Sequence, residues 1–166
     1  MTNLLLPRKT NDGLTGDVKK RSVELMNGVL GTNFILMLKT WVYHWNMVGP
    51  AFHQTHLWFN DLYETLIDDV DSIAERVRAM GGVTLSSTTE MLKGALIEEQ
   101  VGKMPSIPDM IKTLLNDYEV SIKQMRAAVA ILDTLKPSDD GDLNFLQDLI
   151  MRREKDAWML RSNLSS

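Results

Sequence analysis

The chain has 166 residues, a formal net charge of −4 and no cysteine. Hydrophobic residues make up 44% and charged residues 24%, the ordinary balance of a globular domain. The negative charge argues against a domain that binds nucleic acid over its whole surface, and it suits a protein that attracts cations. The lack of cysteine excludes disulfide frameworks, thiolate zinc sites and catalytic thiols. No apolar run approaches a membrane span or a signal-peptide core, so we expect a cytoplasmic protein.

Residues 1–16 are expected to form a flexible N-terminal arm, because Pro7, Gly13 and Gly16 interrupt any regular pattern. Basic side chains lie in this arm or just after it: Arg8, Lys9, Lys19, Lys20 and Arg21. They are either the ordinary charges of a solvated segment or a weak point of attachment for DNA.

Two long amphipathic helices are predicted in the first half of the chain. Apolar residues recur every three or four positions over residues 17–47 and again over residues 52–80, the period of a helix with one buried face. Gly49 and Pro50 separate these segments. Gly81 and Gly82 end the second helix, as glycines commonly do at helix C-termini.

Two more long helices are predicted in the second half. The third is expected to begin near Ser106 and to end at Pro137, and the fourth to run over residues 140–163. A short helix from Ser87 to about Ala95 is expected in the connection before them. One long connection between the second and third helices predicts an all-α four-helix bundle, a single domain over residues 17–166.

The candidate metal ligands are two histidines and two carboxylates. His44 ends the first helix and His56 begins the second, whereas Asp71 and Glu75 lie one turn apart further along the second helix. Residues four apart share a helix face, so these two carboxylates can meet one cation. Imidazole and carboxylate are the ligands expected for iron or another first-row metal. Alternatively, the histidines cap or pack and the acids belong to a solvated face.

The spacing of these residues limits how they can act together. His56 and Asp71 are fifteen residues apart on one helix, which is about 22 Å along its axis. Either they are unrelated, or the site forms between two chains that run antiparallel across a two-fold axis. The chain also lacks the Glu-x-x-His motif of bundles that hold two irons in their core, so a core di-iron oxidase is disfavoured.

The segment 44–76 resembles the signature of the Dps family, the miniferritins named as DNA-binding proteins from starved cells. The similar residues are His44-Trp45-Asn46, Gly49, Phe52, His56, the closing Asp71-x-x-Ala-Glu-Arg and, later, Lys155-x-x-Trp158. The resemblance covers essentially the whole chain after the N-terminal arm. It implies a ferritin-like four-helix bundle with a short extra helix between the second and third long helices.

The resemblance also implies a function in iron storage and detoxification. Such proteins form dodecameric shells, oxidise iron(II), preferably with hydrogen peroxide, and store ferric mineral inside, which protects DNA from oxidative damage. The implied ligands are His44 and His56 of one subunit with Asp71 and Glu75 of its two-fold mate. One alternative is mainly a nucleoid-compacting DNA-binding protein, although the acidic net charge predicts weak or absent DNA binding. Another is a metal-free interaction module.

Three positions near the histidines have less certain roles. Asn60 stands where many relatives carry an aspartate that helps to hold a second, weaker iron, and a neutral amide is a poor iron ligand. Trp45 lies next to the site, where an indole either intercepts radicals or simply packs. His53 is outside the family motif, so we expect it to pack at the surface or at an interface.

Acidic residues at the start of the fourth helix are candidates for an iron pathway. Asp139, Asp140 and Asp142 lie where the family lines the three-fold pores through which iron enters. The alternative is that they are acids favoured by the dipole at a helix N-terminus.

Overall fold

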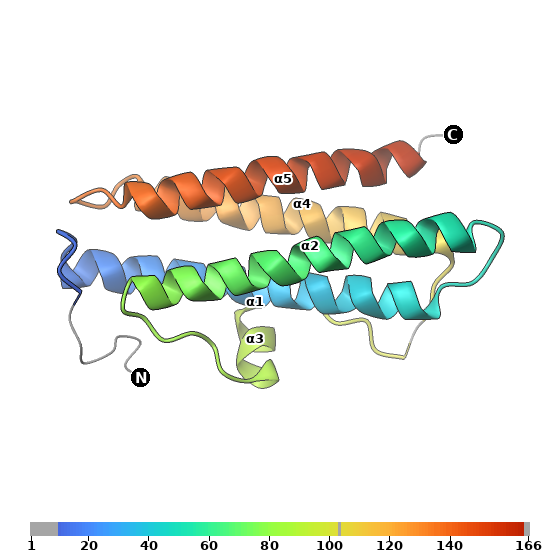
Figure 1. Cartoon of the computed structure of the whole chain (residues 1–166), viewed down its shortest axis with the longest axis horizontal. Coiled ribbons are helices and arrows are strands. Elements are labelled where there is room, and N and C mark those ends of the chain that lie inside the picture. The colour runs from blue at the N-terminus through green and yellow to red at the C-terminus, as the bar shows by residue number, and fades with distance from the viewer. Residues whose placement is uncertain (1–9, 103, 165–166) are drawn as a thin grey trace.

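The computed structural model describes residues 10–102 and 104–164. This part of the chain contains five helices and no strand. Four of the helices are long and lie alongside one another as a bundle (Figure 1). The helices are α1 (Gly16–Asn46), α2 (Phe52–Ala79), α3 (Thr88–Gly94), α4 (Ile107–Leu132) and α5 (Asp140–Leu164). The predicted all-α fold with a short extra helix is confirmed.

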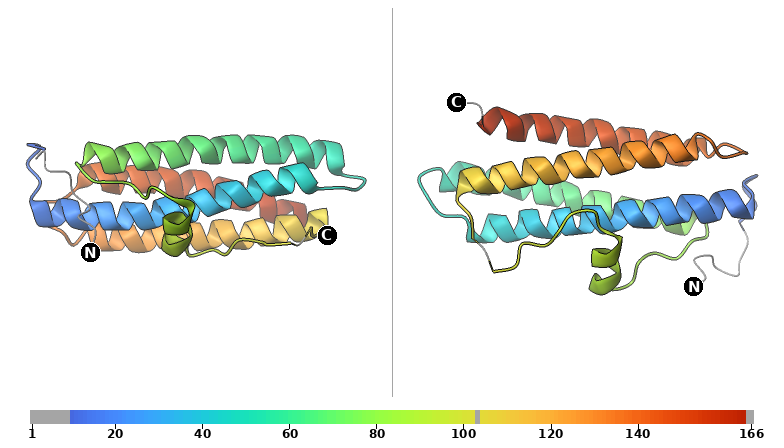
Figure 2. Two further views of the ribbon diagram at one scale, coloured as in Figure 1. Left: turned by 90° about the horizontal axis from the view of Figure 1, so that it is seen from below. Right: turned by 180° about the vertical axis from the view of Figure 1, so that it is seen from behind.

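The long helices form two antiparallel pairs, α1 with α2 and α4 with α5. The connection between the pairs runs back along the bundle, so α2 and α4 point the same way, and α3 stands outside the bundle against α1 (Figure 2). Gly31 permits this contact, because a Cβ there would lie 2.7 Å from the carbonyl oxygen of Met91 in α3. A bundle with one long crossover is the ferritin-like arrangement.

Local capping explains most of the helix boundaries. The hydroxyl groups of Ser87 and Ser106 accept hydrogen bonds from backbone N–H groups in the first turns of α3 and α4, as N-cap serines do. Gly81 adopts a φ of 82° after α2, a conformation that a glycine adopts without strain. The prediction that the third long helix ends at Pro137 is wrong. The helix ends at Leu132, because turn hydrogen bonds follow it before the proline is reached.

A buried polar layer divides the apolar core into two clusters. Its centre is Arg153 of α5, whose side chain is fully buried. The guanidinium pairs with Asp69 of α2 at 2.6 Å, donates to the Asn33 side chain of α1, and lies 5.6 Å from the ring centroid of Tyr118 in α4. Burial raises the pKa of the Tyr118 hydroxyl. One residue from each long helix therefore meets at the middle of the bundle.

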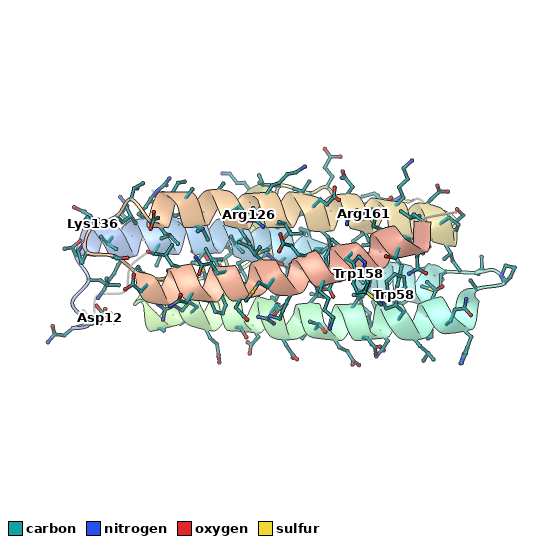
Figure 3. All side chains as sticks on the ribbon, turned by 90° about the horizontal axis from the view of Figure 1, so that it is seen from above. Asp12, Trp58, Arg126, Lys136, Trp158 and Arg161 are labelled. Carbon is teal, nitrogen blue, oxygen red and sulfur yellow. The ribbon has the colours of Figure 1, made fainter. Side chains whose placement is uncertain are left out.

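Part of the predicted arm lies against the start of α1. The Lys19 ammonium group pairs with Asp12 at 2.6 Å, and this hydrogen-bonded pair lowers the pKa of Asp12 to about 2. Asp12 lies at the end of the bundle that also carries Lys136, in the connection between α4 and α5 (Figure 3). Residues 1–9, with Arg8 and Lys9, lie outside the described residues, so the flexibility of the arm stays a prediction. No helix in the described segments is long and apolar enough to cross a membrane.

Candidate metal centre

His44 and His56 face each other where α1 ends and α2 begins. Their rings stack with centroids 3.8 Å apart and an interplanar angle of 17°. Nδ1 of His44 lies 2.9 Å from the carbonyl oxygen of His56, and Nδ1 of His56 lies 3.0 Å from the carbonyl oxygen of His44. Because a carbonyl oxygen only accepts, each Nδ1 carries a hydrogen and donates it. In the neutral ring the lone pair is therefore on Nε2, the form that binds a metal ion.

The short link between the two helices positions this pair. Gly49, at a φ of 133°, lets the chain reverse, and the N–H of Phe52 donates to its carbonyl oxygen as α2 begins. The Phe52 ring stacks on His56 at 5.0 Å, and Tyr63 presents its edge to His44 at 5.1 Å. His44 is only 8% exposed. The rings are thus held by packing as well as by hydrogen bonds.

Asp71 and Glu75 are both exposed on α2. Within the described part of the chain, neither carboxylate takes part in a hydrogen bond or an ion pair. Asp69, two residues before Asp71, is different, because it is buried and paired with Arg153. Of these three acids on α2, Asp69 therefore pairs within the core, whereas the charges of Asp71 and Glu75 are available to a cation.

One chain does not bring the four predicted ligands together. The helix itself separates His56 from Asp71 by about 22 Å. Within residues 10–102 and 104–164, no group of three or more histidine or acidic side chains is placed to hold a metal ion. The two histidines and the two carboxylates are therefore either unrelated or two halves of sites that need a second chain. The roles of these four residues stay predictions.

Aromatic and amide side chains surround the histidine pair. The Tyr63 hydroxyl donates to Oδ1 of the half-buried Asn60 at 2.7 Å, and the Tyr63 ring stacks on Trp41 at 5.5 Å. Trp45, 55% exposed, packs against Trp41 at 4.8 Å, and His53 is exposed. Sequence reasoning missed Trp41 and Tyr63. The available signal was spacing, because Tyr63 lies seven residues after His56 and so shares its helix face.

The acids at the start of α5 are all engaged inside the subunit, Asp140 through a hydrogen bond from the Ser138 hydroxyl at 2.5 Å. Asp139 and Asp142 are buried, and both accept from the guanidinium of Arg76. Asp139 also accepts from the Ser22 hydroxyl and from the N–H of Asp142, so it caps α5. Burial raises the pKa of Asp142 to about 6, and the neighbouring charge of Asp139 adds to this effect. Asp140 alone of the three is exposed, and the pore role of all three stays a prediction.

The sequence is similar to proteins of one family. The family model for the ferritin-like domain matches residues 23–166. An uncharacterized low temperature-induced protein of Nostoc sp. is 37% identical over 157 residues, which cover 95% of this chain and 87% of that protein. DNA protection during starvation protein 2 of Bacillus anthracis is 28% identical, over 89% of this chain and 99% of that protein.

Solved structures show the same relationship. A Dps protein from Vibrio cholerae, described as a member of a broad superfamily of ferritin-like diiron-carboxylate proteins, superposes with a TM-score of 0.88 at 25% identity. The match covers 96% of this chain and 99% of that one. DpsC from Streptomyces coelicolor has a TM-score of 0.90 at 26% identity, over 96% of this chain and 92% of that one. The chain therefore belongs to the ferritin-like proteins and, among them, to the Dps family.

Proposed function

We propose that the protein is a ferroxidase that oxidises iron(II), with hydrogen peroxide as its preferred oxidant, at sites shared between two subunits. The observation that carries this proposal is the reciprocal hydrogen bonding of His44 and His56. It fixes both rings in the form that offers Nε2 to a metal ion. Iron is the substrate of this reaction, and neutral imidazole suits iron as a ligand.

The two halves of the site complement each other. The histidines supply neutral nitrogen ligands, and Asp71 and Glu75 supply two negative charges that no group in the described part of their own chain neutralises. Two subunits related by a two-fold axis, with their α2 helices antiparallel, place the carboxylates of each opposite the histidines of the other. Every such interface then holds two equivalent sites. Carboxylate ligands also stabilise iron(III) over iron(II), which favours the oxidation.

The reaction is a two-electron reduction of peroxide. Two iron(II) ions each lose one electron, and hydrogen peroxide takes both electrons and two protons to give two molecules of water. Iron(II) and peroxide are consumed together, so the one-electron reaction that releases hydroxyl radicals is suppressed. We also assign to Trp45, which follows His44 in the sequence and is 55% exposed, the interception of radicals that escape this reaction.

We further propose a cytoplasmic dodecameric shell that stores the ferric product and thereby protects DNA. Iron(II) would reach the interior by electrostatic attraction to acidic pores. Asp140 is the acid best placed for this role, because Asp139 and Asp142 are already paired with Arg76. Assembly around two-fold axes follows from the shared site, which is incomplete in a single chain.

Direct DNA compaction is the less favoured function, although relatives are named for DNA protection. The net charge is −4. Of the basic residues near the arm, Lys19 is buried against Asp12 and Arg21 pairs with Glu24. We therefore expect weak, salt-sensitive DNA binding. Low-nanomolar binding at physiological salt in a gel-shift series, abolished by deleting residues 1–16, would contradict this view.

The proposed activity is tested by mixing anaerobic iron(II) with limiting peroxide and following ferric absorbance by stopped flow. We expect rapid oxidation by the unmodified protein and slow oxidation by the double variant His44→Ala/His56→Ala. His53→Ala is the matched control, because His53 is an exposed histidine on the same helix as His56. Equal rates for the double variant and the unmodified protein would overturn the proposal.

A further inference from the structure

The side chain of Asn60 accepts a hydrogen bond from Tyr63. The Tyr63 hydroxyl donates to Oδ1 of Asn60 at 2.7 Å, and the Tyr63 ring is itself held between Trp41 and the imidazole of His44. The amide of Asn60 therefore presents Oδ1 to Tyr63 and turns Nδ2 away from it. Its orientation is set by the same cluster of side chains that holds the first metal ligand.

This orientation decides which half of the amide is available. An asparagine side chain accepts through Oδ1 and donates through Nδ2. Oδ1 is engaged by Tyr63, and within the described residues Nδ2 makes no hydrogen bond. Oδ1 is the one atom of the amide that can ligate a metal ion. What Asn60 leaves available is a hydrogen-bond donor, which has no lone pair to offer a cation.

The available donor lies beside the histidine pair. Asn60 is one helical turn after His56, and positions four apart on a helix are neighbours on one face. Asn60 is half-buried, so part of its side chain is accessible from solvent. A donor at such a position stabilises an electron-rich oxygen ligand, whereas it disfavours a second cation.

We propose that Asn60 binds the oxidant, by donating from Nδ2 to the oxygen of a peroxide molecule held by a single iron at the histidines. Tyr63 is a positioning residue that fixes the amide for this role. The inference rests on the proposed ferroxidase function and deepens it. One iron is bound at a time, and the bound peroxide is reduced only when a second iron(II) reaches the site, so that two electrons and two protons convert it to two molecules of water.

Three variants test the role of Asn60 and Tyr63. Asn60→Leu keeps the size of the side chain and removes the donor, so the peroxide concentration at half-maximal rate should rise about five- to tenfold, as expected for one lost hydrogen bond. The number of irons per site should not change. Asn60→Asp offers a carboxylate and should raise that number from one to two. Tyr63→Phe frees the amide to turn and should raise the half-maximal peroxide concentration by a smaller factor.

Two controls separate a direct role from disturbed packing. Asn60→Leu/Tyr63→Phe also removes the hydroxyl that the single leucine variant leaves without its partner, and it should behave like Asn60→Leu. Glu64→Gln, an exposed change one turn further along α2, should leave the dependence on peroxide unaltered. Iron per site is counted by anomalous diffraction at the iron edge, and rates are measured by stopped flow at several peroxide concentrations.

Each outcome has a defined meaning. A raised half-maximal peroxide concentration in Asn60→Leu with unchanged iron content supports the inference. An unchanged dependence on peroxide in Asn60→Leu, or two fully occupied irons in the unmodified protein, overturns the inference and leaves the ferroxidase proposal standing. If the unmodified protein binds no iron at the histidines, the ferroxidase proposal fails and this inference fails with it.

Discussion

His44 and His56 each donate from Nδ1 to the backbone carbonyl oxygen of the other, at 2.9 and 3.0 Å. The same two contacts join the end of α1 to the start of α2 and fix the protonated nitrogen of both rings. The contacts that join the two helices therefore also fix the rings that we propose as metal ligands. A change to either histidine is expected to disturb its partner as well.

The first prediction concerns single histidine variants. His56→Ala removes one proposed ligand and leaves the ring of His44 stacked on nothing, so its orientation is less restricted. We expect iron oxidation to slow at least tenfold, on the scale seen when a metal ligand loses the group that orients it. His44→Ala/His56→Ala should be only slightly slower than either single variant, because the two rings act as a unit. Stopped-flow rates check this. A double variant whose rate falls by the product of the two single-variant factors would contradict it.

The second prediction concerns the carboxylates. Asp71 and Glu75 are exposed and unpaired in the described part of the subunit, so Asp71→Ala/Glu75→Ala should change the free energy of unfolding of the subunit by no more than about 0.5 kcal/mol per substitution. Iron oxidation should nevertheless be lost. Glu64→Ala, another exposed acid on α2, is the control and should keep normal initial rates. An equal loss of rate in the two variants would show that negative charge along α2, rather than ligation, is what matters, and a normal rate in Asp71→Ala/Glu75→Ala would contradict the prediction.

The third prediction concerns the buried ion pair in the centre of the bundle. Arg153→Ala leaves the buried carboxylate of Asp69 with only the partly exposed Arg152 as a partner, so the cost should approach, without exceeding, that of a broken buried pair, about 3–5 kcal/mol. Arg126→Ala breaks an exposed pair with Glu154 and should cost less than about 1 kcal/mol. Thermal unfolding midpoints at one protein concentration compare the two variants. Equal midpoints would show that the pair adds nothing to the stability of the core.

The fourth prediction concerns pH. The pKa of Asp142 is raised from 3.8 to about 6, chiefly by burial, so the fold favours the protonated form. The stability that this carboxyl contributes is therefore present in full below about pH 3.8 and is lost as the pH rises through about 6. The two pKa values set an upper limit of about 3 kcal/mol on the loss. Relative to Asp142→Asn, the unmodified protein should lose thermal stability between pH 4 and pH 7. A constant difference across that range would contradict the prediction.

Much of the fold was predictable because its determinants are local. The three- and four-residue spacing of apolar side chains, the caps at Ser87 and Ser106 and the glycines after α2 specify helices within a residue or so of those observed. The end of α4 was placed too late because Pro137 is a conspicuous breaker. The helix in fact ends earlier, where Thr134 and Leu135 form turn hydrogen bonds that no sequence pattern marks.

The sequence predicted that His44 and His56 act together, but not the contacts that hold them or the neighbouring Trp41 and Tyr63. The identities of His44 and His56 follow from their spacing and from the family signature. Their reciprocal hydrogen bonds depend on how the hairpin of α1 and α2 closes. In the same way, the pairing of Arg76 with Asp139 and Asp142 joins positions more than sixty residues apart. Such contacts are set by three-dimensional packing, to which local spacing gives no access.

The central claim is that each site takes His44 and His56 from one subunit and Asp71 and Glu75 from another. It is tested most directly by unfolding His44→Ala/His56→Ala and Asp71→Ala/Glu75→Ala, mixing the chains in equal amounts and refolding them together. Each variant alone lacks half of the ligands at every site. At a mixed two-fold interface one site keeps all four ligands and the other keeps none, so random assembly leaves about a quarter of all sites intact.

The measurement is the initial rate of peroxide-driven iron oxidation by the mixed shells, with native mass spectrometry confirming that both chains are present in each shell. The shared site predicts a return to about a quarter of the unmodified rate. Confirmed mixed shells whose rate stays at the level of the separate variants would contradict it.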